Sequence, residues 1–155
     1  IDWYRQQKDY TNLLAQYKIL FAKDDANSKY QLGYYNDIFN YLYQSKAAID
    51  NRAGYESQLS KGLLQYIKLN PANADARLLL AKLYINQAND VAKESLLRST
   101  TNAKVMNGYK TAQRNLLLKS NVHLRQIVNK RAAASKAIYE EAKGLLVLNN
   151  RMLKH

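Results

Sequence analysis

The chain has 155 residues, of which 47% are apolar, and 24 Lys and Arg against 12 Asp and Glu give it a formal net charge of +12. This length suits one domain or a short repeat array. The absence of Cys excludes a disulfide framework and Cys-ligated zinc or iron–sulfur sites. One Pro and five Gly argue against a turn-rich all-β fold, and no apolar run approaches the roughly 18 residues that a membrane span needs.

Apolar residues recur at three- and four-residue steps along most of the chain, which is the period of an amphipathic helix. In the first half, this period predicts helices over 10–21, 30–42 and 59–67. Polar runs at 23–28 and 50–54 separate them and are predicted breaks.

The clearest punctuation in the second half is Pro71, which has no backbone N–H and ends the preceding helix. Asn73 is the predicted cap of the next helix, with Asp75 in its first turn. The remaining pattern predicts a turn at 88–90, a break at 99–102, and helices over 104–119 and 122–148, the last interrupted near 131–135. Seven or eight helices with short connections favour antiparallel neighbours.

The junction around Asn70-Pro71 resembles the boundary between two tetratricopeptide repeats. Leu80, Ala81 and Tyr84 take the family's Leu, small and Tyr positions, and residues 88–90 fall where the family turns. A partial second match comprises Lys8-Asp9-Tyr10, the turn-like run 24–27 and Leu32-Gly33.

The resemblance implies an all-α fold: a right-handed α-solenoid of antiparallel helix pairs. Each pair is too small to bury its own apolar stripe, so neighbours must stack. We expect one domain over 1–155, forming part of a larger protein. Its predicted repeat units are 1–27, 28–73 and 74–102, followed by basic C-terminal helices over 103–155.

The resemblance also implies a concave groove lined by the first helix of each pair. On the best-matched helix, the side chains off the packing stripe are Leu78, Lys82, Ile85 and Asn86. Lys82 and Asn86 are one turn apart and suit a carboxylate or a peptide backbone. Plain solvent exposure is the alternative interpretation of these positions.

Tyrosine is abundant, with 13 residues, and suits either helix interfaces or an aromatic groove. Because Tyr34 and Tyr35 are adjacent, we expect one of them to be exposed. Tyr34 is therefore included among the candidate partner-binding residues.

Basic charge is concentrated in the second half of the chain. Residues 1–77 carry 10 bases and 8 acids, residues 78–155 carry 14 and 4, and residues 95–139 contain no acid. Such a surface attracts nucleic acid or anionic glycan. The candidates for this alternative are Lys110, Arg114, Arg125 and Lys130, although a solvated face would look the same.

The sequence offers little for catalysis. Glu140 and Glu141 point about 100° apart on a helix, which is poor geometry for a catalytic pair. His123 has no neighbouring nucleophile or second metal ligand, and the glycines form no phosphate loop. We expect no enzyme activity, no metal and no cofactor.

These features predict a non-catalytic scaffold that binds a partner peptide or helix in its groove. The alternatives are polyanion binding through the basic half, and a helical accessory domain of a larger enzyme or secretion protein. The Asn-, Lys- and Tyr-rich composition suggests a bacterial cell-envelope or periplasmic protein. An uncapped solenoid end would also favour homodimers.

Overall fold

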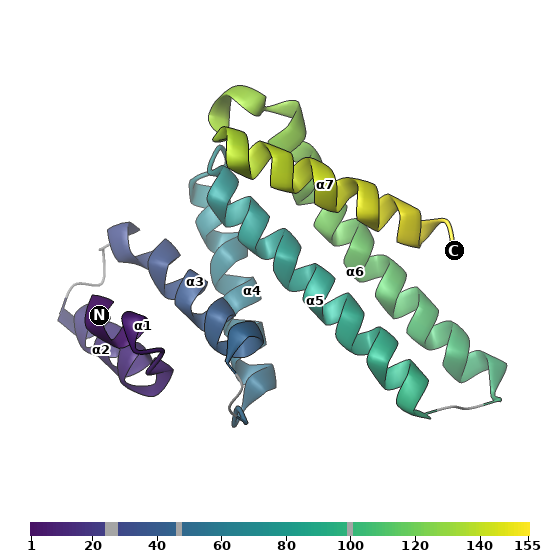
Figure 1. The fold of residues 1–155 in the computed structure, drawn as a ribbon, viewed down its shortest axis with the longest axis horizontal. Coiled ribbons are helices and arrows are strands. Elements are labelled where there is room, and N and C mark those ends of the chain that lie inside the picture. Colours follow the sequence, from purple (N-terminus) through teal and green to yellow (C-terminus); the bar gives the residue numbers. More distant parts are fainter. Residues whose placement is uncertain (24–27, 46–47, 99–100) are drawn as a thin grey trace. The chain divides into compact units, whose positions relative to one another are not determined.

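The computed structural model describes residues 1–23, 28–45, 48–98 and 101–155, and the fold in these residues is all-helical without strands. This confirms the predicted fold class at the level of an all-α protein. The elements, shown in Figure 1, are α1 (Asp2–Gln6), α2 (Tyr10–Lys23), α3 (Ser28–Gln44), α4 (Arg52–Leu69), α5 (Ala74–Arg98), α6 (Ala103–Asn129), the 3₁₀ turn η1 (Arg131–Ala133) and α7 (Lys136–Leu153).

The chain divides into two compact units, Ile1–Tyr66 and Ile67–His155, and the boundary falls near the end of α4. The first unit carries 8 bases and 7 acids, whereas the second carries 16 bases and 5 acids. The charge asymmetry of the sequence therefore coincides with a structural division. That both units belong to one domain stays a prediction.

A charged network ties the helices of the first unit together. Asp37 of α3 is only 2% exposed, and its carboxylate accepts hydrogen bonds from Arg5 Nη2 at 2.9 Å and from Tyr17 Oη at 2.7 Å. Burial and the neighbouring Asp37 raise the pKa of Tyr17 above its ordinary value. Since a buried carboxylate is stable only when it is paired, Arg5 and Tyr17 join α1 and α2 to α3.

The predicted cap Asn73 is confirmed, and side-chain caps also begin the two helices that follow. The Asn73 side chain accepts from Ala76 N at 2.9 Å, Asn102 caps α6, and Ser135 caps α7. The predicted interruption near 131–135 is confirmed, because η1 and its flanks separate α6 from α7. The predicted breaks at 23–28 and 99–102 lie partly outside the described residues, because 24–27 and 99–100 are not described.

Two predicted interruptions are wrong. The predicted turn at 88–90 lies inside α5, where Ala88 is fully buried and the polar residues Asn89 and Asp90 are exposed. The predicted break between 119 and 122 lies inside α6, where Ser120 and Asn121 are fully buried. In both cases, polar residues that favour turns occupy helical positions.

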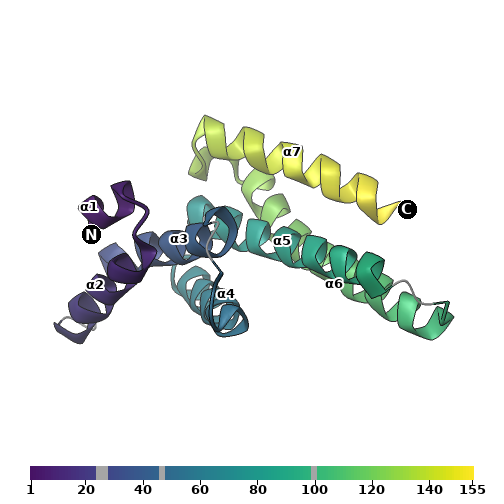
Figure 2. The same cartoon turned by 60° about the horizontal axis from the view of Figure 1, so that its bottom comes forward.

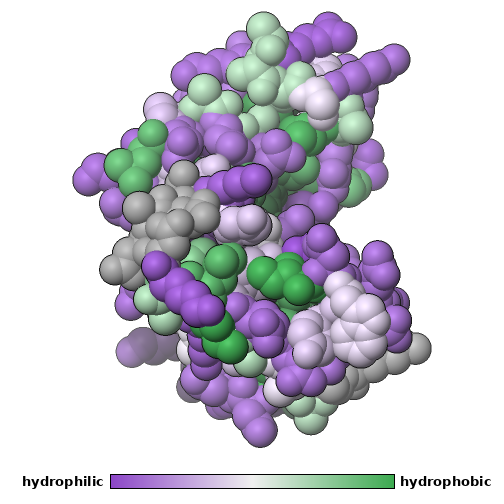
Figure 3. Space-filling model, turned by 90° about the vertical axis from the view of Figure 1, so that its left-hand side faces the viewer, coloured by the Kyte–Doolittle hydropathy of each residue, from purple (hydrophilic) through white to green (hydrophobic). Residues whose placement is uncertain are grey.

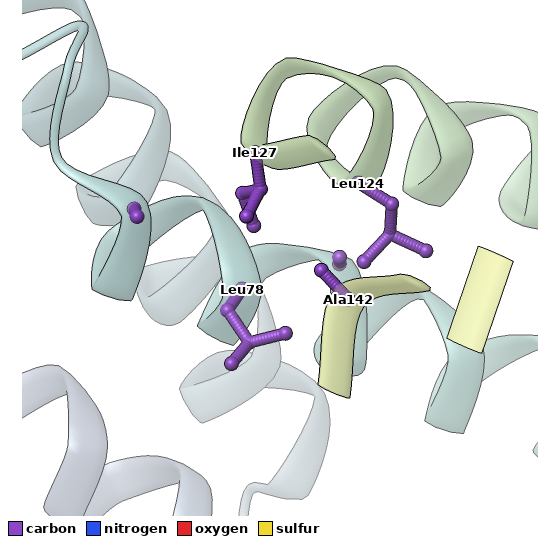
Figure 4. Packing of buried hydrophobic residues seen from close by; sticks show 6 residues of the cluster. Leu78, Leu124, Ile127 and Ala142 are labelled. Atoms are coloured by element: carbon purple, nitrogen blue, oxygen red, sulfur yellow. The ribbon is translucent and has the colours of Figure 1, made fainter. Parts of the chain in front are cut away.

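The core of the second unit forms where α5, α6 and α7 meet. Figures 1 and 2 show α5 and α6 side by side and antiparallel, with α7 packed along α6. Figure 4 shows Leu78 of α5 close to Leu124 and Ile127 of α6 and Ala142 of α7, and these four residues are at most 7% exposed. Burial of such side chains stabilises the unit by roughly 1.5–3 kcal/mol for each large aliphatic residue.

A buried polar network crosses the same three helices. Ser120 Oγ donates to the Ala81 carbonyl of α5 at 3.0 Å. Asn149 Nδ2 of α7 donates to Ser120 Oγ at 3.2 Å and to Asn121 Oδ1 at 2.9 Å. Asn121 Nδ2 donates to Asn150 Oδ1 at 3.0 Å. Sliding any of these helices by one turn would leave buried amides without partners, so the network fixes their register.

Replacing Asn149 with alanine should lower the free energy of unfolding by about 2 kcal/mol, because buried hydrogen-bonding groups of Ser120 and Asn121 lose their partner. The measurement is urea denaturation followed by circular dichroism. Asn115→Ala, at an exposed position of α6, is the matched control and should change stability by less than about 0.5 kcal/mol. Equal effects of the two substitutions would show that the network does not determine the packing.

Candidate functional site

The predicted groove on α5 is occupied by packing. Leu78, predicted to line the groove, is instead a core residue that is 7% exposed. Lys82 Nζ forms an ion pair with Glu141 Oε1 of α7 at 2.6 Å. Ile85 and Asn86 are half-buried. The expectation that Leu78 faces a partner is therefore wrong, because α6 and α7 cover that part of α5.

Tyr34 packs against other aromatic side chains of the first unit. Its ring lies 5.1 Å from that of Tyr17 and 5.2 Å from that of Phe21, and its hydroxyl accepts from Gln58 Nε2 at 2.6 Å. Burial raises the pKa of both Tyr34 and its neighbour Tyr35. Both side chains are half-buried, so the expectation that one of the pair is exposed is wrong.

The four residues predicted to bind a polyanion are exposed, unlike Leu78 and Tyr34. Lys110, Arg114, Arg125 and Lys130 are all exposed. At about 100° per residue, Lys110, Arg114 and Arg125 lie within about 60° of arc on α6. Lys130 is the C-cap residue of that helix, next to η1. Three of the four predicted bases therefore share one face, and the fourth lies at its end.

Two exposed stripes with the same spacing run along α6 and α7. On α6 the stripe contains Arg114, Leu118, Val122 and Arg125. On α7 it contains Lys143, Val147 and Arg151, and it ends at the C-cap residue Lys154. Each set spans about 80° of arc and about 16 Å of helix axis. The three apolar members remain substantially in water, since Leu118 is 39%, Val122 53% and Val147 52% exposed.

Both stripes lie on the same side of the contact between the two helices. Ser120 contacts Asn149 and also reaches α5, whereas Asn121, the next residue of α6, contacts both Asn149 and Asn150. On antiparallel helices, the next positions outward from Asn121 and Asn150 are those of Arg114 and Lys143, and the other members of the stripes follow farther from the contact. We call these eight residues the α6–α7 basic face.

The basic face contains five cations without intramolecular partners of opposite charge. Within the described residues, none of Arg114, Arg125, Lys143, Arg151 and Lys154 forms an ion pair. Arg114 Nη1 donates to the Leu153 carbonyl at 3.1 Å, which fixes the guanidinium beside the end of α7. Glu140 is the nearby acid, one turn before Lys143 on α7. The face therefore has a positive potential that is largely uncompensated.

At one end, the contact between α6 and α7 opens into a depression of about 230 Å³. Its apolar lining comes from the buried Leu117 together with Met152 and Leu153, and Lys110 and Arg114 stand among its other lining residues. The depression is smaller than typical small-molecule pockets, so it suits a single side chain.

Sequence reasoning missed the α7 half of this face. The predicted polyanion site depended on the acid-free run 95–139, and Lys143, Arg151 and Lys154 lie beyond that run. The i, i+4, i+8, i+11 spacing of these stripes was the available signal.

His123 is a buried titratable group on the α5 side of α6. Its ring stacks on Tyr84 with centroids 6.3 Å apart, and Arg77 Nη1 lies 3.2 Å from its Nδ1. Burial first, and then the positive charge of Arg77, lower the pKa of His123 to about 4. The ring is therefore neutral at pH 7, where it packs against Tyr84.

Stability should fall as the pH falls from about 6.5 to about 4. In that pH range His123 is protonated in the unfolded chain but not in the folded chain. The free energy of unfolding therefore begins to fall near the pKa of His123 in the unfolded chain, and it stops falling below the pKa of His123 in the folded chain. The effect is at most about 3 kcal/mol. Urea midpoints from pH 7 to 4 should show it, and His123→Gln should remove this part of the slope. His155→Gln, at an exposed position, should leave the slope intact.

Comparison with protein-family models, curated proteins and solved structures finds no match to this chain. Among the described residues, no group of three or more His, Cys, Asp or Glu side chains is placed to hold a metal ion. No helix in the described ranges has the length and apolarity needed to cross a membrane. On the face seen in Figure 3, hydrophilic side chains predominate and the described hydrophobic ones form separate patches.

Proposed function

We propose that the chain is a non-catalytic helical interaction module that binds an anionic partner through the α6–α7 basic face. The observation that supports this proposal most directly is the set of five exposed cations without ion-pair partners on one side of two adjoining helices. The positive electrostatic potential of these cations steers and orients an oppositely charged partner. Binding to a protein partner agrees with the function expected from the sequence, but at a different surface.

The finer architecture, a tetratricopeptide-like α-solenoid, is part of this proposal. In its favour, the Asn70-Pro71 junction coincides with the boundary between α4 and α5, and α5 and α6 are antiparallel neighbours. Against it, α5 is a single helix where the resemblance expects a turn at 88–90. Placement in a bacterial cell envelope, based on composition, stays a prediction.

Nucleic acid or anionic glycan is the second candidate partner. It is favoured by α6, whose 27 residues contain five bases and no acid. The apolar members of the basic face weigh against it, because Leu118, Val122 and Val147 have no counterpart in a phosphate or sulfate backbone. These residues favour an acidic protein partner, which presents apolar and anionic side chains together.

Charge reversal on the face should weaken binding of an acidic polypeptide, and poly-L-glutamate is a suitable probe. The double variant Arg125→Glu and Arg151→Glu should lose about tenfold or more in affinity at 50 mM NaCl, because both changes place like charges against the probe. Binding of the unaltered chain should also weaken steeply between 50 and 300 mM NaCl. Fluorescence anisotropy measures both effects.

The matched control is Lys93→Glu with Lys119→Glu, which gives the same change in net charge at exposed positions outside the basic face. This variant should lose clearly less affinity than the face variant. Equal losses would mean that net charge alone drives binding, and the proposed site would then be rejected.

A further inference from the structure

We infer that the depression between α6 and the C-terminal end of α7 is the anchor site for the acidic partner. It would take one apolar side chain that has an aspartate or glutamate next to it in the partner's sequence. This inference rests on the proposed function and adds the place and the chemistry of the anchor. Its support comes from the cavity itself: its lining, its volume and the two cations that stand at it.

The depression has walls from both helices. One face of α6 lines it with four residues at i, i+3, i+4 and i+7 spacing, which are Lys110, Gln113, Arg114 and Leu117. The last turn of α7 adds the apolar side chains of Met152 and Leu153. Apolar and cationic groups therefore lie together in one cavity, and both helices are needed to form it.

The volume and the apolar lining suit one large side chain. The depression measures about 230 Å³, whereas pockets for drug-sized ligands usually measure about 300–1,000 Å³. Leu117 is 2% exposed and Met152 is 40% exposed, so the lining includes apolar surface that water still reaches. A leucine or phenylalanine in the depression would remove that surface from water. Binding energy in an interface concentrates at well-packed anchors of this kind.

Two cations stand at the depression and have no acidic partner. Lys110 and Arg114 are exposed and one turn apart, and neither forms an ion pair in the described part of the chain. No Asp or Glu is among the residues that line the depression. On α7, the acid nearest to Met152 in sequence is Glu141, about 16 Å away along the helix axis. The depression therefore attracts a negatively charged group.

The guanidinium of Arg114 is held in place before any partner binds. Its Nη1 donates to the Leu153 carbonyl at 3.1 Å, which uses one of the five N–H donors of the group. The remaining donors suit a carboxylate, because arginine binds the two carboxylate oxygens bidentately. A side chain that is ordered beforehand also loses less conformational entropy on binding. An acidic residue of the partner would therefore meet Arg114 while its apolar neighbour lies against Leu117.

The probes are two short fluorescein-labelled peptides that contain the same number of glutamates. Their central residue is leucine in one peptide and serine in the other. The leucine peptide should bind about tenfold more tightly at about 150 mM NaCl, because it alone buries an apolar side chain. Fluorescence anisotropy measures both dissociation constants, and their ratio reports the apolar anchor separately from the charge.

Two variants of the depression should remove this preference for leucine. Met152→Ser takes away part of the apolar lining, and Gln113→Phe places a ring where the leucine would lie. Each should lower the ratio of the two dissociation constants to about twofold or less. Leu148→Ser, at a 51% exposed leucine of α7 outside the depression, is the matched control and should keep the tenfold ratio. Circular dichroism checks the fold of each variant, and Gln113→Phe carries the test if Met152→Ser does not fold.

The two peptides also separate failure of this inference from failure of the proposed function. Arg125→Glu with Arg151→Glu should weaken both peptides and keep their ratio, since neither residue lines the depression. If the two peptides bind equally, or if both depression variants keep the ratio, the inference is rejected and the proposed function stands. If the charge-reversal variant weakens neither peptide, the basic face is not the binding surface and both proposals fall.

A free carboxylic acid is the other source of the same chemistry. The competitor 4-methylpentanoate joins a carboxylate to a leucine-like group and should displace the leucine peptide only at far higher concentrations than unlabelled leucine peptide does. Displacement at equal concentrations would assign the depression to a small free acid and overturn its role as an anchor for a polypeptide.

Discussion

The second unit depends on a buried hydrogen-bond network that admits one register of its helices. Leucine and alanine contacts among α5, α6 and α7 could be satisfied after a slide of one turn, because apolar burial is non-directional. The buried hydrogen bonds would not survive such a slide. It would leave the amides of Asn121 and Asn149 and the hydroxyl of Ser120 buried without partners. The exposed surface of α6 and α7 is therefore set by residues inside the unit.

That register decides which surfaces are available. With α7 packed along α6, its Glu141 lies beside Lys82 of α5, and Leu78 is enclosed by Leu124, Ile127 and Ala142. The α5 surface that was predicted to line a groove is therefore covered by α6 and α7. The same arrangement places the stripe from Lys143 to Lys154 next to the stripe from Arg114 to Arg125, which creates a surface that neither helix has alone.

Local signals in the sequence predicted local structure well. Asn73 and Pro71 mark the α4–α5 boundary because a capping side chain and a missing N–H act within a few residues. The break predicted between 119 and 122 was wrong because Ser120 and Asn121, which favour turns, are held in a helix by Asn149. That partner lies 28 or more positions away, so local sequence does not show it. Half of the basic face was missed for the same reason, since the proximity of α7 to α6 is a tertiary property.

The distribution of acids explains why the basic face remains charged. In the second unit, Glu141 pairs with Lys82 and Glu94 pairs with Arg98, both away from the face. Five cations on adjoining stripes repel one another, which costs some stability, and intramolecular pairing does not relieve that repulsion. An anionic partner would relieve it, so binding and stability should be linked: the complex should be harder to unfold than the free chain, most clearly at low ionic strength.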